Sequence, residues 1–188
     1  MLNCVVQSRA AGDTSRKYAR VERERRFLLA KGPDLDEAVR TVRLVDRYFL
    51  GTRVRLRQAL QTSASGALVV YKLTQKVPVA DGGPGLITTM YLSEQECAAF
   101  AAVPANELRK TRYSIPPFGV DVFEGALEGL TMAEVEFASD AEMRDFVAPA
   151  AVAEVTCDER FTGGRLAATT RDELAAILLS FDLGLGRD

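Results

Sequence analysis

The sequence predicts an α+β fold that is mostly β, built as one domain around an antiparallel sheet. The chain has 188 residues, a length that suits a single domain. Several segments alternate apolar and charged residues with a period of two, which is typical of half-buried strands. Clusters of Gly and Pro at 81–85 and 116–119 separate such segments and indicate turns between neighbouring strands.

The expected strands share this alternation and follow one another along most of the chain. They span residues 19–29, 42–50, 53–60, 67–77, 85–92, 107–115, 118–124, 131–138 and 152–157. Stretches with helical character span residues 33–40, 93–103, 139–147 and 171–182. The second of these begins at Ser93 and has Glu96 three residues later, the pairing of a capping box. The last has apolar residues at helical spacing, so we expect it to pack on the sheet or on a partner.

The ends of the chain and its cysteines predict a simple organisation. Residues 1–17 are polar after the first few positions and are expected to form a flexible N-terminal arm. Cys4, Cys97 and Cys157 lie far apart without CxxC spacing, which argues against a disulfide framework or a zinc knuckle. No segment is typical of a signal peptide or a membrane span, so the sequence predicts a cytoplasmic protein that binds no membrane.

The composition excludes several classes of chemistry. The chain contains no histidine, which removes Ser-His-Asp and Cys-His catalysis and the usual histidine-containing zinc sites. Any reaction must therefore use carboxylates, Lys or Arg, hydroxyl groups or metal ions with oxygen ligands. The formal net charge of −2 argues against a general nucleic-acid binder, which usually has a marked excess of basic residues.

Charged residues of one sign repeat at alternate positions on several expected strands. Acidic pairs occupy two strands, at Glu22 with Glu24 and at Glu134 with Glu136. Basic residues repeat in the same way on three other strands, at Arg53, Arg55, Arg57, Lys72, Lys76, Lys110 and Arg112. Residues at i and i+2 share one face of a strand, so these like charges repel one another.

Two interpretations of this charge pattern are open. Each strand could simply have one face in water. Alternatively, a sheet closed into a barrel with the charged face inward would have one carboxylate wall and one basic wall. Such a lining suits phosphates, because Arg and Lys bind phosphate oxygens while carboxylates hold a divalent cation that bridges to the same phosphates.

The charged blocks resemble the CYTH superfamily, the triphosphate tunnel metalloenzymes. Glu22-Arg-Glu-Arg-Arg26 resembles the family's ExExK signature, and Leu73-Thr-Gln-Lys76 resembles its LTxK motif. The other matching blocks begin at Arg53, Lys110, Val120, Gly129 and Glu154. The resemblance covers about residues 19–170, in the family's order.

This resemblance implies both a fold and a site. The fold is a closed eight-stranded antiparallel β-barrel, the triphosphate tunnel, with peripheral helices, formed by residues 18–188. The implied metal ligands, for Mg²⁺ or Mn²⁺, are Glu22, Glu24, Glu134 and Glu136, with Asp121 and Asp158 as further acidic support. The implied phosphate-binding residues are Arg26, Arg53, Arg55, Arg57, Lys72, Lys76, Lys110 and Arg112.

The chain departs from the family pattern at two places. The signature lysine is replaced by Arg26, which keeps the charge but adds a planar set of donors. Residues 161–164 read Phe-Thr-Gly-Gly where relatives often have an Asn, so the C-terminal segment is expected to be arranged differently.

Three functions remain open at this point. The first is metal-dependent hydrolysis of inorganic tripolyphosphate or of an organic or nucleoside triphosphate. The second is an adenylate cyclase-like conversion of ATP to cyclic AMP, although the sequence has no recognisable motif that reads a base. The third is a non-catalytic module that binds polyphosphate, which would not need all four carboxylates.

Overall fold

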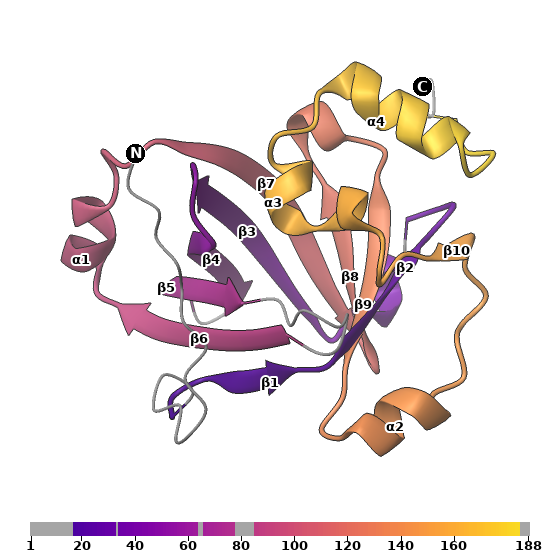
Figure 1. Cartoon of the computed structure of the whole chain (residues 1–188), viewed down its shortest axis with the longest axis horizontal. Coiled ribbons are helices and arrows are strands. Elements are labelled where there is room, and N and C mark those ends of the chain that lie inside the picture. Colours follow the sequence, from indigo (N-terminus) through magenta and orange to yellow (C-terminus); the bar gives the residue numbers. More distant parts are fainter. Residues whose placement is uncertain (1–16, 33, 64–65, 78–84, 185–188) are drawn as a thin grey trace, which may run out of the picture.

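The main element of the protein is a curved antiparallel sheet (Figure 1). The computed structural model describes residues 17–32, 34–63, 66–77 and 85–184. In spatial order, the strands are β1 (Arg20–Glu22), β6 (Gly85–Leu92), β5 (Gly66–Val77), β4 (Val54–Ser63), β3 (Arg40–Phe49), β7 (Ala105–Ile115), β8 (Phe118–Phe123), β9 (Thr131–Glu136), β2 (Glu24–Leu28) and β10 (Ala153–Glu154). The expected antiparallel, mostly β character is confirmed. Residues 1–16 of the expected N-terminal arm and most of the expected turn at 81–85 lie outside the described residues.

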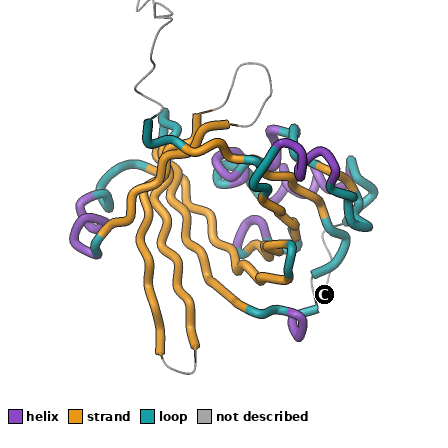
Figure 2. The backbone as a smooth tube through the Cα atoms, turned by 90° about the horizontal axis from the view of Figure 1, so that it is seen from below, coloured by secondary structure: helices purple, strands orange, loops and turns teal. Residues whose placement is uncertain are grey.

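The expected closed eight-stranded barrel is wrong. Within the described residues the sheet has ten strands, with β1 and β10 at its edges, and it curves without closing (Figure 2). The reason lies at Arg23, which interrupts the first expected strand. Before this residue β1 pairs with β6, and after it β2 pairs with β9, so the two halves belong to opposite ends of the sheet. A closed barrel needs an unbroken ladder round its circumference, and the chain changes partners here instead.

The helices are short and peripheral. The capping box at Ser93 and Glu96 is confirmed and begins α1 (Glu94–Ala99). The other expected helices appear as α2 (Asp140–Asp145) and α4 (Arg171–Leu179). The helix expected over 33–40 is wrong, because the described residues of this span form only the single 3-10 turn η2 (Leu35–Glu37) before β3 begins at Arg40. Further short helices are η3 (Gly125–Leu127), η4 (Glu159–Phe161) and α3 (Gly163–Leu166).

Two apolar clusters cover the sheet and leave part of one face free. One cluster packs strand residues such as Leu28 and Met132 against Phe161 and Leu174 of the C-terminal segment. The other packs Phe27 and its neighbours on the opposite face, against the segment that follows α2. Each buried Leu or Phe side chain stabilises the fold by roughly 1.5–3 kcal/mol, so both coverings are firmly held.

α3 and α4 lie together over one end of the sheet, whereas α2 lies at a different part of it (Figure 1). No helix within the described ranges is long and apolar enough to span a membrane.

Candidate functional site

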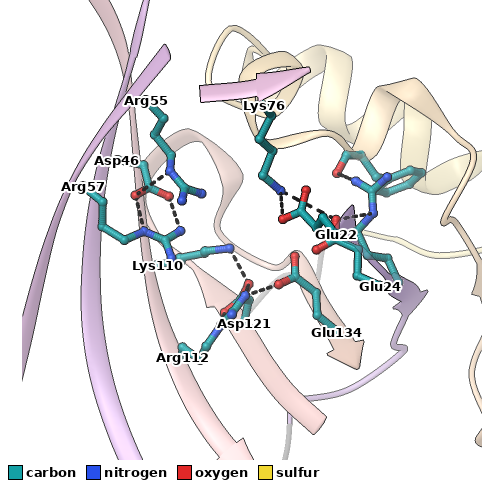
Figure 3. Close-up of polar contacts among 12 residues, drawn as sticks. Glu22, Glu24, Asp46, Arg55, Arg57, Lys76, Lys110, Arg112, Asp121 and Glu134 are labelled. Carbon is teal, nitrogen blue, oxygen red and sulfur yellow. Dashed lines mark hydrogen bonds and ion pairs between the residues drawn. The ribbon is translucent and has the colours of Figure 1, made fainter. Parts of the chain in front are cut away.

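Charged side chains from several strands converge on one face of the sheet, here called the inner face. Figure 3 shows Lys76, Lys110 and Glu134 pointing toward one another from different strands. The strand register explains this, because Asp46 lies opposite Arg57, and Arg57 lies opposite Lys72. The alternation read from the sequence therefore holds across neighbouring strands.

The opposite face takes the residues of the other parity. Arg23 forms an ion pair with Asp140 of α2. Arg25 donates from Nε and Nη2 to the two carboxylate oxygens of Glu154, at 2.9 and 2.6 Å. These arginines connect the sheet to its covering segments, as expected for residues outside the site.

The acidic part of the inner face begins at Glu22 and Glu24. Lys76 Nζ lies 2.7 Å from Glu22 Oε1 and 3.8 Å from Glu24 Oε1. Burial raises the pKa of Glu24, and the negative charges of Glu134 and Glu22 raise it further. The positive charge of Lys76 lowers it, but not enough to cancel these effects. The acidic residues are therefore close enough to repel one another, and a lysine partly offsets that repulsion.

A second group connects Glu134 to the basic side. Arg112 donates to both Asp121 and Glu134, and Lys110 donates to the fully buried Asp121. Burial alone would raise the pKa of Glu134, but the charges of Arg112, Lys110 and Lys76 bring it well below its usual range. Glu134 is therefore ionised at neutral pH.

The basic side contains a buried carboxylate that was not among the predicted site residues. Asp46 is 0% exposed and accepts hydrogen bonds from Arg57 Nε and Nη2, both at 2.6 Å. Arg55 Nε lies 3.9 Å from the same carboxylate. A usable signal was present in the sequence, because Asp46 shares the parity of Val42, Leu44 and Tyr48, on the otherwise apolar face of its strand.

Tyr48 completes this group. Burial, reinforced by the charge of Asp46, raises the pKa of Tyr48 to about 12. Its hydroxyl is therefore protonated at neutral pH. The Tyr48 side chain packs against Gly163, where even one added carbon would overlap the Tyr48 hydroxyl oxygen. The Gly-Gly pair that departs from the family pattern thus makes room for this tyrosine.

The remaining predicted residues are spread more widely. Arg53 lies exposed in the turn before β4, and Lys72 Nζ lies 5.0 Å from the centre of the Tyr91 ring. Glu136 is exposed and lies opposite Glu24. Asp158 instead begins η4, where it accepts hydrogen bonds from Arg160.

Arg26 is on the inner face, and its guanidinium contacts the C-terminal segment. Its Nη1 donates to Phe161 O at 2.7 Å, and its Nη2 donates to Thr156 O at 2.6 Å. Its Nε lies 3.8 Å from Glu24 Oε1. Arg26 thus fastens the C-terminal segment to β2 next to the acidic residues.

The inner face suits a hard divalent cation by the type of its donors. Glu22, Glu24 and Glu134 offer only carboxylate oxygens, the ligands that Mg²⁺ and Mn²⁺ prefer. Among the described residues, however, no three acidic or thiol side chains are already arranged as a metal site. Lys76 and Arg112 neutralise these carboxylates instead.

Two solved structures, both of the protein NE1496, are similar to the chain. "The crystal structure of the inorganic triphosphatase NE1496" has 27% sequence identity and a TM-score of 0.52, covering 80% of this chain and 96% of that one. "The crystal structure of the hypothetical protein NE1496" has 29% identity and the same TM-score of 0.52, covering 79% and 99%. No family model and no curated protein sequence matches the chain. The similarity to NE1496 supports the relationship to the CYTH superfamily that the sequence blocks indicate.

Proposed function

We propose that the protein is a divalent-metal-dependent triphosphatase, which hydrolyses inorganic tripolyphosphate or an organic or nucleoside triphosphate on its inner face. The observation that carries this proposal is the convergence of basic and acidic side chains on that face. Basic side chains of β4, β5 and β7 lie across from acidic side chains of β1, β2 and β9 (Figure 3). A linear polyanion with a bound cation needs both kinds of group in one place.

The basic residues hold the phosphate chain. Arg55, Arg57 and Arg112 present planar guanidinium groups, and Lys76 and Lys110 act as point charges. These groups orient the phosphate chain and offset its charge, and positioning and charge stabilisation provide most of the catalysis in phosphoryl transfer. Water adds to a phosphorus atom as one phosphoanhydride bond breaks, and the basic residues stabilise the negative charge that develops on the leaving phosphate.

The acidic residues would hold the cation, with Glu22, Glu24, Glu134 and Glu136 as its ligands. When bound, Mg²⁺ or Mn²⁺ supplies Lewis acidity and charge neutralisation at the phosphate oxygens. In the structure Lys76 shares these carboxylates, so the cation and Lys76 compete for Glu22 and Glu24. A phosphate group that draws Lys76 away would free both carboxylates.

The relatedness to NE1496 agrees with this proposal, since one of its structures is named as an inorganic triphosphatase. The experiment incubates the protein with Mg²⁺ and a panel of tripolyphosphate, ATP and thiamine triphosphate, and measures phosphate, diphosphate and cyclic AMP. Release of phosphate or diphosphate that requires Mg²⁺ supports the proposal. Cyclic AMP without hydrolysis would indicate a cyclase, and binding without any product would indicate a polyphosphate-binding module.

A further inference from the structure

We propose that Asp46 is a positioning residue, which orients Arg57 and Arg55 for the triphosphate and weakens binding of the free anion in favour of turnover. The proposal rests on the proposed function and deepens it. It concerns a carboxylate that neither binds phosphate nor belongs to the acidic side of the inner face.

The contacts of Asp46 are the first support. Asp46 is 0% exposed, and Arg57 lies directly opposite it on the neighbouring strand. Both carboxylate oxygens accept from this one guanidinium, through Nε and Nη2 at 2.6 Å each. Such a two-point contact fixes the plane of the guanidinium as well as its position.

The contact leaves only part of Arg57 for a ligand. Since Nε and Nη2 are directed at Asp46, Nη1 is the nitrogen that Asp46 does not engage. Arg55 Nε lies 3.9 Å from Asp46 Oδ1, the oxygen that also accepts from Arg57 Nε. This Arg55 nitrogen is buried and has no hydrogen-bond partner in the described structure. Asp46 therefore fixes the orientation of the Arg57 guanidinium, and its charge attracts that of Arg55 beside it.

The charge of Asp46 has an opposite effect on affinity. Burial alone would raise its pKa, but hydrogen bonds and charge from Arg57, with Arg55 and Lys110, hold the pKa below its usual range. The buried group is consequently a full negative charge beside the basic residues that face the substrate. It repels a polyanion in the ground state, while the orientation it imposes favours the reacting geometry.

A purely structural salt bridge would behave differently, and the chain contains a matched example. Glu154 accepts from Arg25 Nε and Nη2 in the same two-point manner on the opposite face of the sheet. Losing either carboxylate leaves an arginine without its partner. Losing Asp46 removes a charge from the inner face, whereas losing Glu154 removes one from the opposite face.

The test compares the wild-type protein with Asp46→Asn, Asp46→Glu and Glu154→Gln. Binding of tripolyphosphate without metal is measured by calorimetry and by the shift in melting temperature, and kcat and KM are measured with Mg²⁺. For Asp46→Asn we expect a dissociation constant and KM lower by roughly tenfold, because one repelling charge is gone. We expect kcat to fall by about 10- to 100-fold, because the guanidinium groups are no longer oriented.

The other variants separate charge from position. Asp46→Glu keeps the charge but moves the carboxylate, so KM should stay within about twofold while kcat falls by at least roughly tenfold. This variant gives the answer even if Asp46→Asn does not fold. Glu154→Gln should lower the melting temperature and leave both constants within about twofold of the wild type.

Two results would overturn the inference. In the first, wild-type protein binds and hydrolyses tripolyphosphate, yet both Asp46 variants keep the wild-type kcat and KM. In the second, the Asp46→Asn protein binds tripolyphosphate more weakly than the wild type. If the wild-type protein itself neither binds nor hydrolyses any triphosphate, the proposed function fails, and the inference falls with it.

Discussion

Glu24 and Glu136 are directly opposed residues of the neighbouring antiparallel strands β2 and β9. Like charges at such positions destabilise a sheet. Glu134 lies two residues before Glu136, opposite Arg26, so the acidic part of the inner face extends along β9. Under the proposed function, a bound cation would offset the like charges gathered here.

The first prediction concerns these two carboxylates. Glu24→Gln and Glu136→Gln should each reduce Mg²⁺-dependent hydrolysis by at least roughly 100-fold, because each would remove a proposed ligand of the cation. The free energy of unfolding should stay the same or rise without metal, since one repelling charge is removed. Rates of phosphate release and urea denaturation measure the two effects.

The matched control for these variants is Glu107→Gln. Glu107 is a strand carboxylate whose ion pair with Arg109 is well exposed to solvent, away from the inner face. The Glu107→Gln protein should hydrolyse the substrate at the wild-type rate. Wild-type rates and Mg²⁺ affinity in both Glu24→Gln and Glu136→Gln would remove these residues from the site.

The second prediction concerns the basic residues. Tripolyphosphate without metal should raise the melting temperature, because it binds the folded protein and not the unfolded chain. Arg57→Ala and Lys76→Ala should reduce this shift by at least about half, since each substitution removes a positively charged side chain that faces the ligand. Arg23→Ala should keep the full shift, because Arg23 bonds to Asp140 on the other face. An equal reduction of the melting-temperature shift in all three variants would mean that tripolyphosphate does not bind preferentially to the inner face.

The third prediction concerns the attachment of the C-terminal segment. A lysine in place of Arg26 cannot reach both Thr156 O and Phe161 O with separate planar donors. Arg26→Lys should therefore lower the free energy of unfolding by about 1–3 kcal/mol. It should also speed amide hydrogen exchange around Phe161.

Arg47→Lys is the comparison for this variant. Arg47 donates to Phe100 O, Ala101 O and Val103 O, next to α1 rather than next to Glu24. We expect a similar loss of stability with unchanged hydrolysis, whereas Arg26→Lys should lose activity as well. Unchanged stability and unchanged exchange in Arg26→Lys would show that the two carbonyl contacts do not hold the segment.

The fourth prediction concerns acid stability. Because the folded-state pKa of Asp46 lies below its ordinary value of 3.8, its ionised form stabilises the folded protein above that pH. This contribution disappears as the pH falls below 3.8 through the folded-state value. At pH 7 the Asp46→Asn protein should be less stable than the wild type by about 3–5 kcal/mol, since Arg57 loses its buried partner.

The difference in the free energy of unfolding between the wild type and the Asp46→Asn protein should then narrow as the pH falls from about 5 towards 2. Urea denaturation at several pH values measures it. A difference that is constant over this range would mean that the charge of Asp46 does not stabilise the fold.

The strands and the charged face could be predicted from the sequence because both depend on local alternation. Every second residue of a strand points to the same side, so Arg55 and Arg57, or Lys72 and Lys76, share a face whatever the wider topology. The capping box at Ser93 depends on a spacing of three residues and was equally readable. Short-range patterns of this kind do not depend on which strands pair, so the sequence alone is enough to predict them.

The openness of the sheet could not be predicted because it depends on which strands pair. Nothing in the residues around Arg23 indicates that β1 and β2 have different neighbours. The same limit applies to Arg26, whose donors reach carbonyl groups more than a hundred residues away. Asp46 lies between these cases, since the apolar face of its strand marked it as buried but not as the partner of Arg57.

The location of the cation is the most direct test of the proposed triphosphatase site. Crystals grown with Mn²⁺ and tripolyphosphate would locate the metal by its anomalous scattering and the phosphate chain by its density. The account predicts a metal peak among Glu22, Glu24, Glu134 and Glu136, with phosphates between that peak and Arg55, Arg57 and Arg112. Metal and phosphates bound together elsewhere on the protein, with the inner face empty of both, would contradict it.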